Sequence, residues 1–413
     1  MTEHDRAEAI RAYNPFAGNR LGIDAPAAAN AAIVNRTVCV TFADGLQTAF
    51  HHQWLRQNCY CPACGNPADG IRFTTVVSFD GSIAPARVDT VDGDLVVTWP
   101  DGHESTYGPD WLRHHAYDDD GRARRAAWRS TMWRSELADD FPTSTWADAS
   151  DGGAGQLRLY QLLRDHGIVR VAGLGRESSH TEALAALIGP IHETTVYGRI
   201  YDVKAEPVAK LGAKTGMPQA PHIDDAFYYS PPGIDIFHCL VNTDEGGLST
   251  YVDGFAIAAD IERENREAFE LLTTQPIQQI RRHPDEIDLR NRGPLVSLDE
   301  WGNPRGIRYF DRALAPLDLE PALIEPMYDA IREFNRRMID PTFTAAIRVA
   351  PGDGILIDNH RVLHGRTAFD PSLGRHMRLC HVPRDEFHGR LRELSRHLDP
   401  DHHDLHLPQG SKT

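Results

Sequence analysis

Apolar and polar residues follow two periods along the chain, and each period predicts one kind of element. Alternation at every second position in 37–45 (TVCVTFADG) and 94–102 (DLVVTWPDG) predicts two strands that each run into a turn. In 156–167 (QLRLYQLLRDHG) apolar residues instead recur at helical spacing, and the closing Gly167 is typical of a helix C-cap. The chain is therefore expected to be β-rich first and helical next.

Strands are expected to dominate again after residue 190. Apolar segments bounded by Gly and Pro turns predict strands at 168–174, 194–203, 233–242, 249–254, 306–310, 345–359 and 376–382, and helical spacing predicts helices at 181–190 and 320–340. Many short strands with helices gathered ahead of them predict a fold that is mainly β with α. A jelly roll or barrel braced by helices has this order of elements.

The same patterns divide the chain into four segments. An Ala-rich, polar stretch at 1–30 is interpreted as a flexible N-terminal segment, and 31–120 as a small β domain. Residues 121–398 are expected to form the larger domain, and 399–413 a polar, His-rich tail.

Charge and hydropathy exclude several classes of protein. The chain has 43 Lys and Arg against 59 Asp and Glu, a net charge of −16, so phosphate backbones would repel it and nucleic-acid binding is not expected. No apolar run reaches the roughly 18 residues of a membrane span. The N-terminus lacks the basic start and apolar core of a secretory signal, so a cytoplasmic protein with a small-molecule substrate is expected.

Three of the six cysteines lie within six positions. Cys59, Cys61 and Cys64 can present three thiolates from one turn, and His103, in the turn of WPDGHESTY, is the best candidate for a fourth ligand. A Cys3His set is a closed, tetrahedral structural zinc site. The alternative is three free, buried cysteines. A redox or catalytic role is disfavoured because a closed set leaves no position open.

A second set of metal ligands is spread over the larger domain. His222 and Asp224 are two residues apart on an expected strand, so both side chains would face one cation, and His364 follows 142 residues after His222. Two imidazoles and one carboxylate are the ligand set of non-haem Fe(II) oxygenases, in which the cosubstrate and O2 occupy the open positions. A lone His-x-Asp has a structural role in most chains, so the prediction depends on the whole set.

Arg375 lies eleven residues after His364. A buried guanidinium can hold a carboxylate through two parallel hydrogen bonds, as the distal carboxylate of 2-oxoglutarate requires. Arg378, three positions further on the expected strand, would face the opposite side.

Five segments carry a resemblance to a known family: WLRQNCYCPACGN, WPDGHESTY, HIDDAFYYSPPGIDIFHCLVNTDEGGLSTYVDGF, VLHGRTAF and GRHM. The chain resembles the γ-butyrobetaine/trimethyllysine dioxygenases, within the taurine-dioxygenase-like group, over residues 37–395. The resemblance implies a double-stranded β-helix (jelly roll) catalytic domain after a small zinc-binding β domain. It also implies a homodimer, Fe(II), 2-oxoglutarate and O2 as cofactor and cosubstrates, structural Zn(II), and ascorbate as an activator.

The resemblance also implies roles for single residues. Zinc would be held by Cys59, Cys61, Cys64 and His103, and Fe(II) by His222, Asp224 and His364. Arg375 would bind 2-oxoglutarate, and Ser249 would help to hold its carboxylate, although an exposed turn serine is an equally ordinary interpretation.

The expected substrate pocket departs from the aromatic cage by which the family holds a trimethylammonium group. Tyr197 and Tyr201 fall on two cage positions, whereas Lys214 and His381 stand where tyrosines are usual. Asp225, after the iron-binding Asp224, replaces an apolar or aromatic residue and could pair with an amine. A lysine in the pocket would repel a quaternary ammonium and favour a carboxylate, phosphate or sulfonate. The alternative is that Lys214 lies in a surface loop.

These observations predict a dioxygenase that hydroxylates an unactivated C–H bond of a small zwitterionic or anionic metabolite, with decarboxylation of 2-oxoglutarate to succinate and CO2. One alternative is a true γ-butyrobetaine or trimethyllysine hydroxylase with a modified cage. Another is an oxygenase of specialised metabolism that desaturates or cyclises its substrate. A non-catalytic binding module is disfavoured because the set His222, Asp224, His364 and Arg375 is complete.

Overall fold

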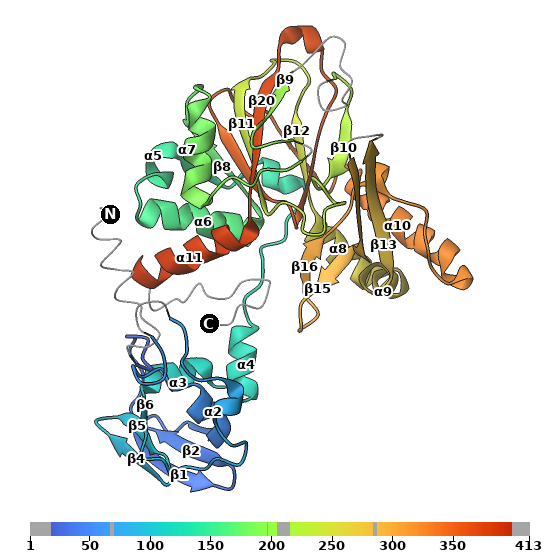
Figure 1. Ribbon diagram of the computed structural model, residues 1–413. Helices are drawn as coiled ribbons and strands as arrows, with labels where there is room; N and C mark the ends of the chain where they lie inside the picture. Colours follow the sequence, from blue (N-terminus) through green and yellow to red (C-terminus); the bar gives the residue numbers. More distant parts are fainter. Residues whose placement is uncertain (1–17, 67–69, 196, 205–214, 284–286, 399–413) are drawn as a thin grey trace. The chain divides into compact units, whose positions relative to one another are not determined.

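The computed structural model describes residues 18–66, 70–195, 197–204, 215–283 and 287–398 (Figure 1). Contacts within the chain divide these residues into two compact units, one ending at Trp128 and one spanning Arg129–Leu398. The boundary lies eight residues beyond the expected 120. Among the described helices, none combines the length and the apolar character that crossing a bilayer requires.

The N-terminal unit consists of two antiparallel three-stranded sheets, β1-β2-β3 and β4-β5-β6. The alternation expected for 37–45 is present, because Val38, Val40 and Phe42 of β2 are buried in the unit's core. The elements are β1 (Ala28–Val34), β2 (Thr37–Phe42), β3 (Gln47–His51), α2 (His52–Gln57), β4 (Arg87–Val91), β5 (Asp94–Thr98), β6 (Glu104–Tyr107), α3 (Pro109–His115) and α4 (Asp119–Arg125).

The described part of the N-terminal segment is held in this unit rather than loosely attached. Asn19 is buried, donates to the backbone oxygen of Asn58 at 2.7 Å and accepts from the backbone N–H of Tyr60 at 2.9 Å. Residues 28–30 already belong to β1. The expectation of a flexible 1–30 is therefore wrong for 18–30, because Asn19 satisfies backbone groups at the start of the cysteine turn. Residues 1–17 and the tail 399–413 lie outside the described residues.

The larger unit has a mixed α/β fold with extensive sheets (Figure 1). A six-stranded sheet has the order β7-β8-β18-β11-β20-β9, and a four-stranded sheet the order β10-β19-β12-β17. The strands are β7 (Thr143–Thr145), β8 (Ile168–Ala172), β9 (Tyr201–Lys204), β10 (Gln219–His222), β11 (Ile234–Val241), β12 (Ser249–Asp253), β13 (Pro276–His283), β14 (Ile287–Pro294), β15 (Val296–Leu298), β16 (Pro304–Ile307), β17 (Thr344–Ile347), β18 (Gly354–Asp358), β19 (Val362–Arg366) and β20 (His376–Val382). The helices are α5 (Trp146–Ala149), α6 (Ala154–His166), α7 (Ser179–Ile188), α8 (Gly254–Glu264), α9 (Arg266–Thr274), α10 (Ile324–Met338) and α11 (Arg384–Leu398).

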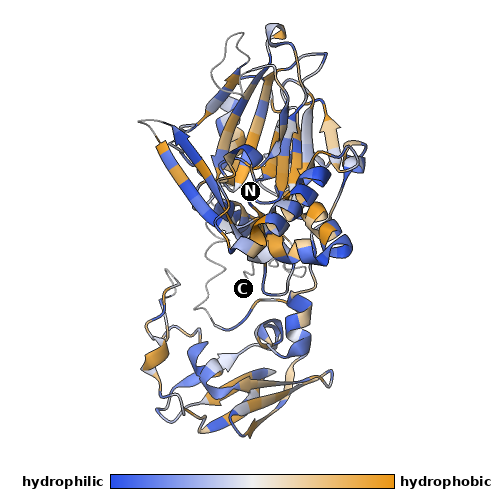
Figure 2. Cartoon of the chain, turned by 90° about the vertical axis from the view of Figure 1, so that its right-hand side faces the viewer, coloured by the Kyte–Doolittle hydropathy of each residue, from blue (hydrophilic) through white to orange (hydrophobic). Residues whose placement is uncertain are grey.

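Side-chain alternation on the six-stranded sheet assigns its residues to two different cores. Ile355 and Ile357 of β18 pack with Tyr251 of β12 and Val362 of β19, which belong to the other sheet. Leu356, between them, packs on the opposite face with residues of α6, α7 and α11. Figure 2 shows many hydrophobic residues in the strands of the larger unit. The two sheets therefore face one another, and the helices cover the outside of the larger one.

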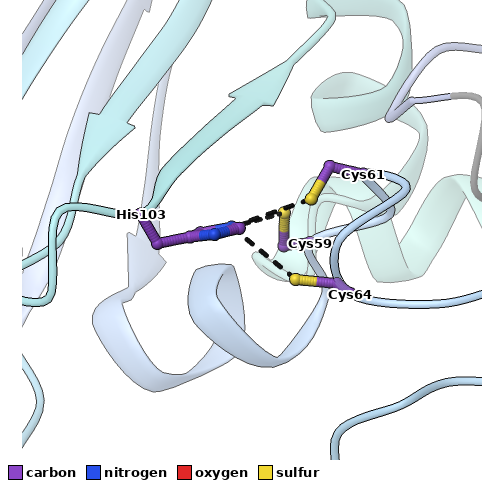
Figure 3. Close-up of side chains that lie close together, drawn as sticks. All are labelled: Cys59, Cys61, Cys64 and His103. Carbon is purple, nitrogen blue, oxygen red and sulfur yellow. Dashed lines mark hydrogen bonds between the residues drawn. The ribbon is translucent and has the colours of Figure 1, made fainter.

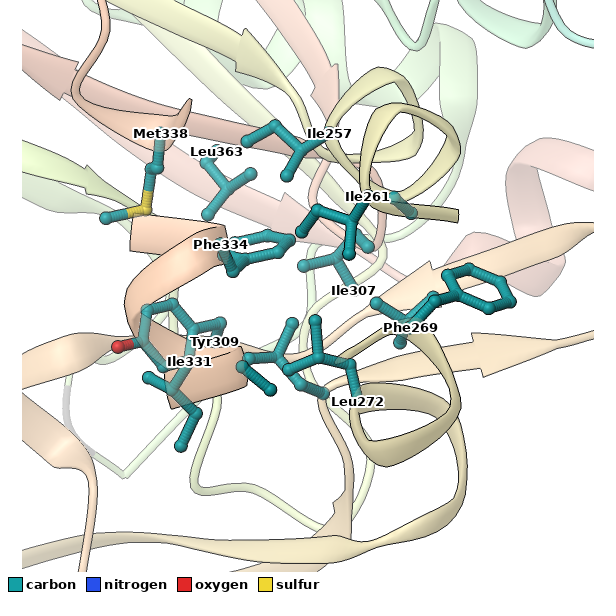
Figure 4. Packing of buried hydrophobic residues seen from close by; sticks show 14 of the residues in the cluster. Ile257, Ile261, Phe269, Leu272, Ile307, Tyr309, Ile331, Phe334, Met338 and Leu363 are labelled. Carbon is teal, nitrogen blue, oxygen red and sulfur yellow. The ribbon is translucent and has the colours of Figure 1, made fainter. Parts of the chain in front are cut away.

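A third core stabilises the outer face of the four-stranded sheet (Figure 4). Phe334 of α10 and Ile261 of α8 pack with Leu363 of β19 and Ile307 of β16. Because neighbouring residues on a strand point to opposite faces, burying Leu363 outward turns His364 toward the space between the sheets.

The strand expected at 194–203 is only partly present. The chain turns back on itself between Thr194 and Gly198, whose backbone groups exchange hydrogen bonds, and β9 begins only at Tyr201. Gly198 has a φ of 67°, which only glycine adopts readily, so the turn excludes a continuous strand here.

Arg361 offers a test of stability in this unit. Its guanidinium is buried, binds both carboxylate oxygens of buried Asp253 at 3.0 and 2.7 Å, and donates to the backbone oxygens of Asp165 and Thr131. We expect Arg361→Met to lower the free energy of unfolding by about 3–5 kcal/mol, because it leaves the buried carboxylate of Asp253 without its cation. The measurement is hydrogen exchange of peptides covering β12 and β19.

Arg332→Met is the matched control for this prediction. Arg332 forms an exposed ion pair with Asp329, and such pairs contribute about 0–1 kcal/mol. The prediction would be contradicted if Arg361→Met lowered the free energy of unfolding by no more than the control does.

Candidate functional site

His222 and His364 lie opposite each other on paired strands. His222 ends β10 and is in register with His364 of β19, and their rings are 4.6 Å apart. Nδ1 of His222 donates to the backbone oxygen of Ala220 at 3.0 Å, which leaves its Nε2 lone pair free. The Nε2 atoms of His222 and His364 are 3.4 and 3.7 Å from Oδ1 of Asp224. Two imidazoles and one carboxylate thus converge on one point.

Asp224 is oriented by a turn rather than by a strand. β10 ends at His222, so the expected same-face placement of His222 and Asp224 on one strand is wrong. Asn359 instead holds the backbone of Asp224, accepting from its N–H at 2.8 Å and donating to its carbonyl oxygen at 3.0 Å. Asn359, which was not foreseen from the sequence, is therefore a positioning residue for Asp224.

The three groups fit a divalent metal such as Fe(II). Burial lowers the pKa of His364 to about 3, so its imidazole is neutral, the form that binds metals. Burial opposes ionisation of Asp224, but the His364 and His222 rings lower its pKa overall, so it is a carboxylate. Ligand atoms about 2.1 Å from one cation at right angles are about 3.0 Å apart, so Oδ1 of Asp224 would have to approach each Nε2 atom by only about half an ångström.

The three ligand candidates line a cavity, and Arg366, Arg375 and Ser249 are among its other lining residues. Arg375 is buried, and its Nε has no hydrogen-bond partner among the described residues. Arg366, which also lines the cavity, donates to the backbone oxygens of Thr215 and Met217, and burial beside Arg375 lowers its pKa to about 10. Ser249, the first residue of β12, lies in the same lining and in register with Arg366. A buried guanidinium whose Nε lacks an acceptor fits a carboxylate such as the distal group of 2-oxoglutarate.

Arg366 was not foreseen from the sequence, although its signal was present. It follows His364 by two residues on β19, and residues two apart on a strand point to the same face. The sequence therefore allowed Arg366 to be placed on the side of His364.

The cavity has a volume of about 430 Å³ and is lined from both sheets and from β13. Tyr197 and Tyr201 both line it, with ring centroids 4.9 Å apart. Asp225 lines it as well, and burial next to Asp224 raises the pKa of Asp225 to about 7. Lys214 lies outside the described residues.

His381 lies beside the iron-ligand candidate Asp224, with a ring nitrogen within 4.8 Å of one of its carboxylate oxygens. It is buried and pairs with Asp235 of β11, Nδ1 to Oδ1 at 2.6 Å, and it is not among the described residues that line the cavity. Its ring centroid is 6.4 Å from that of Tyr197. Burial alone would lower the pKa of His381, but Asp235 raises it to about 9, so the imidazole is cationic. Asp235, also not foreseen, was visible as a lone charge between two isoleucines of an apolar strand.

The cysteine cluster is assembled in the N-terminal unit (Figure 3). Nε2 of His103, from the β5–β6 turn, lies 3.5, 3.8 and 3.6 Å from the sulfur atoms of Cys59, Cys61 and Cys64. Tetrahedral zinc with Zn–S of about 2.3 Å and Zn–N of about 2.05 Å places sulfur and nitrogen about 3.6 Å apart. Nε2 of His103 therefore lies at the distance from the three sulfur atoms that a tetrahedral zinc site would require.

Arg56 is a cation beside this cluster that was not foreseen from the sequence. It is 5% exposed, and its Nη1 donates to Sγ of Cys64 at 3.4 Å. Three thiolates around a divalent ion carry a net charge of −1, which a buried guanidinium offsets.

Comparison with known proteins matches both units. The family described as "Taurine catabolism dioxygenase TauD, TfdA family" matches residues 127–381, and "Gamma-butyrobetaine hydroxylase-like, N-terminal" matches residues 31–113. A gamma-butyrobetaine dioxygenase of Pseudomonas sp. (strain AK-1) is 35% identical, covering 89% of this chain and 96% of that protein. The mitochondrial trimethyllysine dioxygenase of Gallus gallus is 30% identical, covering 86% and 85%.

Among solved structures, a taurine dioxygenase from Burkholderia xenovorans matches with 14% identity and a TM-score of 0.42, covering 55% of this chain and 81% of that chain. A similarity this low supports no conclusion about this chain.

Proposed function

The chain belongs to the taurine catabolism dioxygenase TauD, TfdA family, and from that membership we propose that it hydroxylates an unactivated C–H bond of a small zwitterionic or anionic metabolite. It is an Fe(II)- and 2-oxoglutarate-dependent dioxygenase. The proposed reaction consumes substrate, 2-oxoglutarate and O2, and yields the hydroxylated substrate, succinate and CO2. We further propose that the two facing sheets form a double-stranded β-helix.

Each group of residues has a part in this proposal. His222, Asp224 and His364 hold iron, and bound iron supplies the activation of O2 that an unreactive C–H bond requires. Arg375 and Ser249 hold and orient the carboxylate of 2-oxoglutarate. The cavity between the sheets orients the target C–H bond and limits the access of water.

The position of Arg281 supports an anionic or zwitterionic substrate over a quaternary ammonium compound. Its guanidinium carbon lies 5.8 Å from the ring centroid of Tyr197, and its Nη1 donates to the Tyr197 hydroxyl at 3.3 Å. A cation of the protein thus already lies beside Tyr197, where it would repel a trimethylammonium group. Arg312 also lines the cavity and adds positive charge for a substrate anion, whereas Arg282 of the same lining pairs with Asp288.

A second candidate function is hydroxylation of γ-butyrobetaine or trimethyllysine. It is favoured by the 35% identity to a gamma-butyrobetaine dioxygenase and by the adjacent rings of Tyr197 and Tyr201. The two candidates differ in whether the cavity accepts a trimethylammonium group.

We also propose a structural zinc ion at Cys59, Cys61, Cys64 and His103. The match of the sulfur–nitrogen distances to a tetrahedron supports it, and so does the guanidinium of Arg56 beside Cys64. The site is closed by four protein ligands, so the ion would stabilise the unit rather than take part in the reaction.

The test is proton NMR detection of succinate with Fe(II), 2-oxoglutarate, ascorbate and O2. We expect coupled turnover with amino acids, sulfonates or phosphonates, and little with γ-butyrobetaine or trimethyllysine. Turnover confined to the two quaternary compounds would establish the second candidate. The absence of any succinate from protein carrying one iron per chain would overturn the assignment of the cavity as an oxygenase site.

A further inference from the structure

Asp225 is a buried acidic residue that lines the cavity and has no hydrogen-bond partner for its carboxyl group among the described residues. Asp225 is 2% exposed and lines the cavity, and neither its Oδ1 nor its Oδ2 has a hydrogen-bond partner among the described residues. Buried polar groups in folded proteins almost always have such partners, and leaving one unpaired is costly. Two unpaired oxygens at the edge of a cavity therefore point to a ligand that donates hydrogen bonds to them.

The backbone holds Asp225 in an uncommon conformation. Its φ is 53°, in the left-handed region, and its carbonyl oxygen accepts from the N–H of Tyr228 at 2.9 Å. The other described non-glycine residues with positive φ, Asn35 and Asp92, lie in the tight turns of the β1–β2 and β4–β5 hairpins. Asp225 closes no hairpin. Strain kept at such a position is found where a side chain has to be presented to a site.

Two cationic side chains of the described residues, Arg281 and His381, act on Asp225 electrostatically and form their hydrogen bonds with other residues. Nη1 of Arg281 donates to the hydroxyl of Tyr197, and Nδ1 of His381 bonds to Asp235. Neither makes a hydrogen bond to Asp225. Both carboxyl oxygens of Asp225 thus lack a hydrogen bond from these two side chains and can accept one from a group that enters the cavity.

We propose that Asp225 binds an N–H-bearing ammonium group of the substrate, so that the enzyme selects primary or secondary amines over quaternary ammonium compounds. This rests on the proposed function, because it assumes that the cavity receives the substrate. An ammonium with N–H bonds can donate to both oxygens, and such charge-assisted bonds are among the strongest in proteins. A trimethylammonium group has no donor and would leave both oxygens unpaired.

The test uses ω-amino acids of three to six carbons, each paired with its N,N,N-trimethyl counterpart. Binding is measured by calorimetry under argon on the full-length protein loaded with Fe(II) and 2-oxoglutarate. We expect at least one amine to bind about tenfold or more tightly than its trimethyl counterpart, the scale of a charge-assisted hydrogen bond. In Asp225→Asn this preference should fall to within about twofold.

Asn is the chosen replacement because it keeps the shape of Asp and tolerates a left-handed φ. Asp92→Asn, the same change at φ 51° in a distant hairpin, is the control and should keep the wild-type preference. Three results would overturn the proposal: no amine of the series binding, an equal or tighter fit of the trimethyl compounds, or a preference unchanged in Asp225→Asn. Equal weakening of both members of a pair leaves the preference unchanged and counts as the third.

Failure of this proposal is distinguishable from failure of the proposed function. Succinate formation coupled only to substrates without an amine would remove the role of Asp225 and leave the oxygenase intact. Selective amine binding without any 2-oxoglutarate turnover would support the role of Asp225 and remove the assignment as an oxygenase.

Discussion

Replacing His222 with alanine is expected to remove bound iron and to lower succinate formation by more than about a thousandfold. The change leaves only His364 and Asp224, and two ligands do not fix a metal against water and free chelators. The measurements are iron per chain by mass spectrometry after anaerobic loading, and succinate by proton NMR.

His192→Ala is the control for this substitution. The side chain of His192 is exposed, and its backbone N–H donates to the carbonyl oxygen of His381 at 2.8 Å, a bond that alanine preserves. It should keep iron and turnover. Succinate formation by His222→Ala within tenfold of the wild type would show that the iron ligands have been assigned to the wrong residues.

Replacing Cys64 with serine is expected to abolish stoichiometric zinc and cooperative folding of the N-terminal unit. Structural zinc in small domains contributes roughly 10–16 kcal/mol of binding free energy, as much as the roughly 5–15 kcal/mol by which a whole domain is stable. The loss should appear as fast hydrogen exchange of peptides from 50–115, and as less than one zinc per chain.

Cys39→Ser separates this effect from the loss of a thiol alone. Cys39 is a free, partly exposed cysteine of β2 that takes no part in the cluster. It should retain zinc and slow exchange. If Cys64→Ser kept one zinc per chain with unchanged exchange, the cluster would not be a structural metal site.

The two clusters of candidate ligands could be predicted from the sequence because each combines residue types that suit one kind of metal site. Three thiols in six positions need only one turn, and His103 is brought to them by an ordinary hairpin. The strands at 233–242 and 376–382 were predictable because apolar runs between turns carry their own signal. The helices α8, α9 and α11 and the β13–β14 hairpin were not foreseen.

The details of the cavity could not be predicted, because they depend on contacts between distant segments. Arg281 reaches Tyr197 from a hairpin that the sequence pattern did not reveal, and Asn359 binds the backbone of Asp224 across 135 positions of the chain. Alternation along one strand failed for Asp224 because its orientation is determined by Asn359. His381 was expected in the cavity from its cage position, and its pairing with Asp235 could not be foreseen because Asp235 comes from a strand 146 positions away.

The separation of ligands along the chain implies an order for metal binding during synthesis. Cys59 and His103 are 44 positions apart, so the zinc site can close once the first hundred or so residues have been made. The iron site needs His364 of β19 and the bond from Asn359 to Asp224, which become available only when most of the chain exists. Closing so long a loop costs conformational entropy that contacts elsewhere have to offset first. We therefore expect zinc to bind a nascent chain and to guide its folding, and iron to enter an oxygenase unit that is already folded.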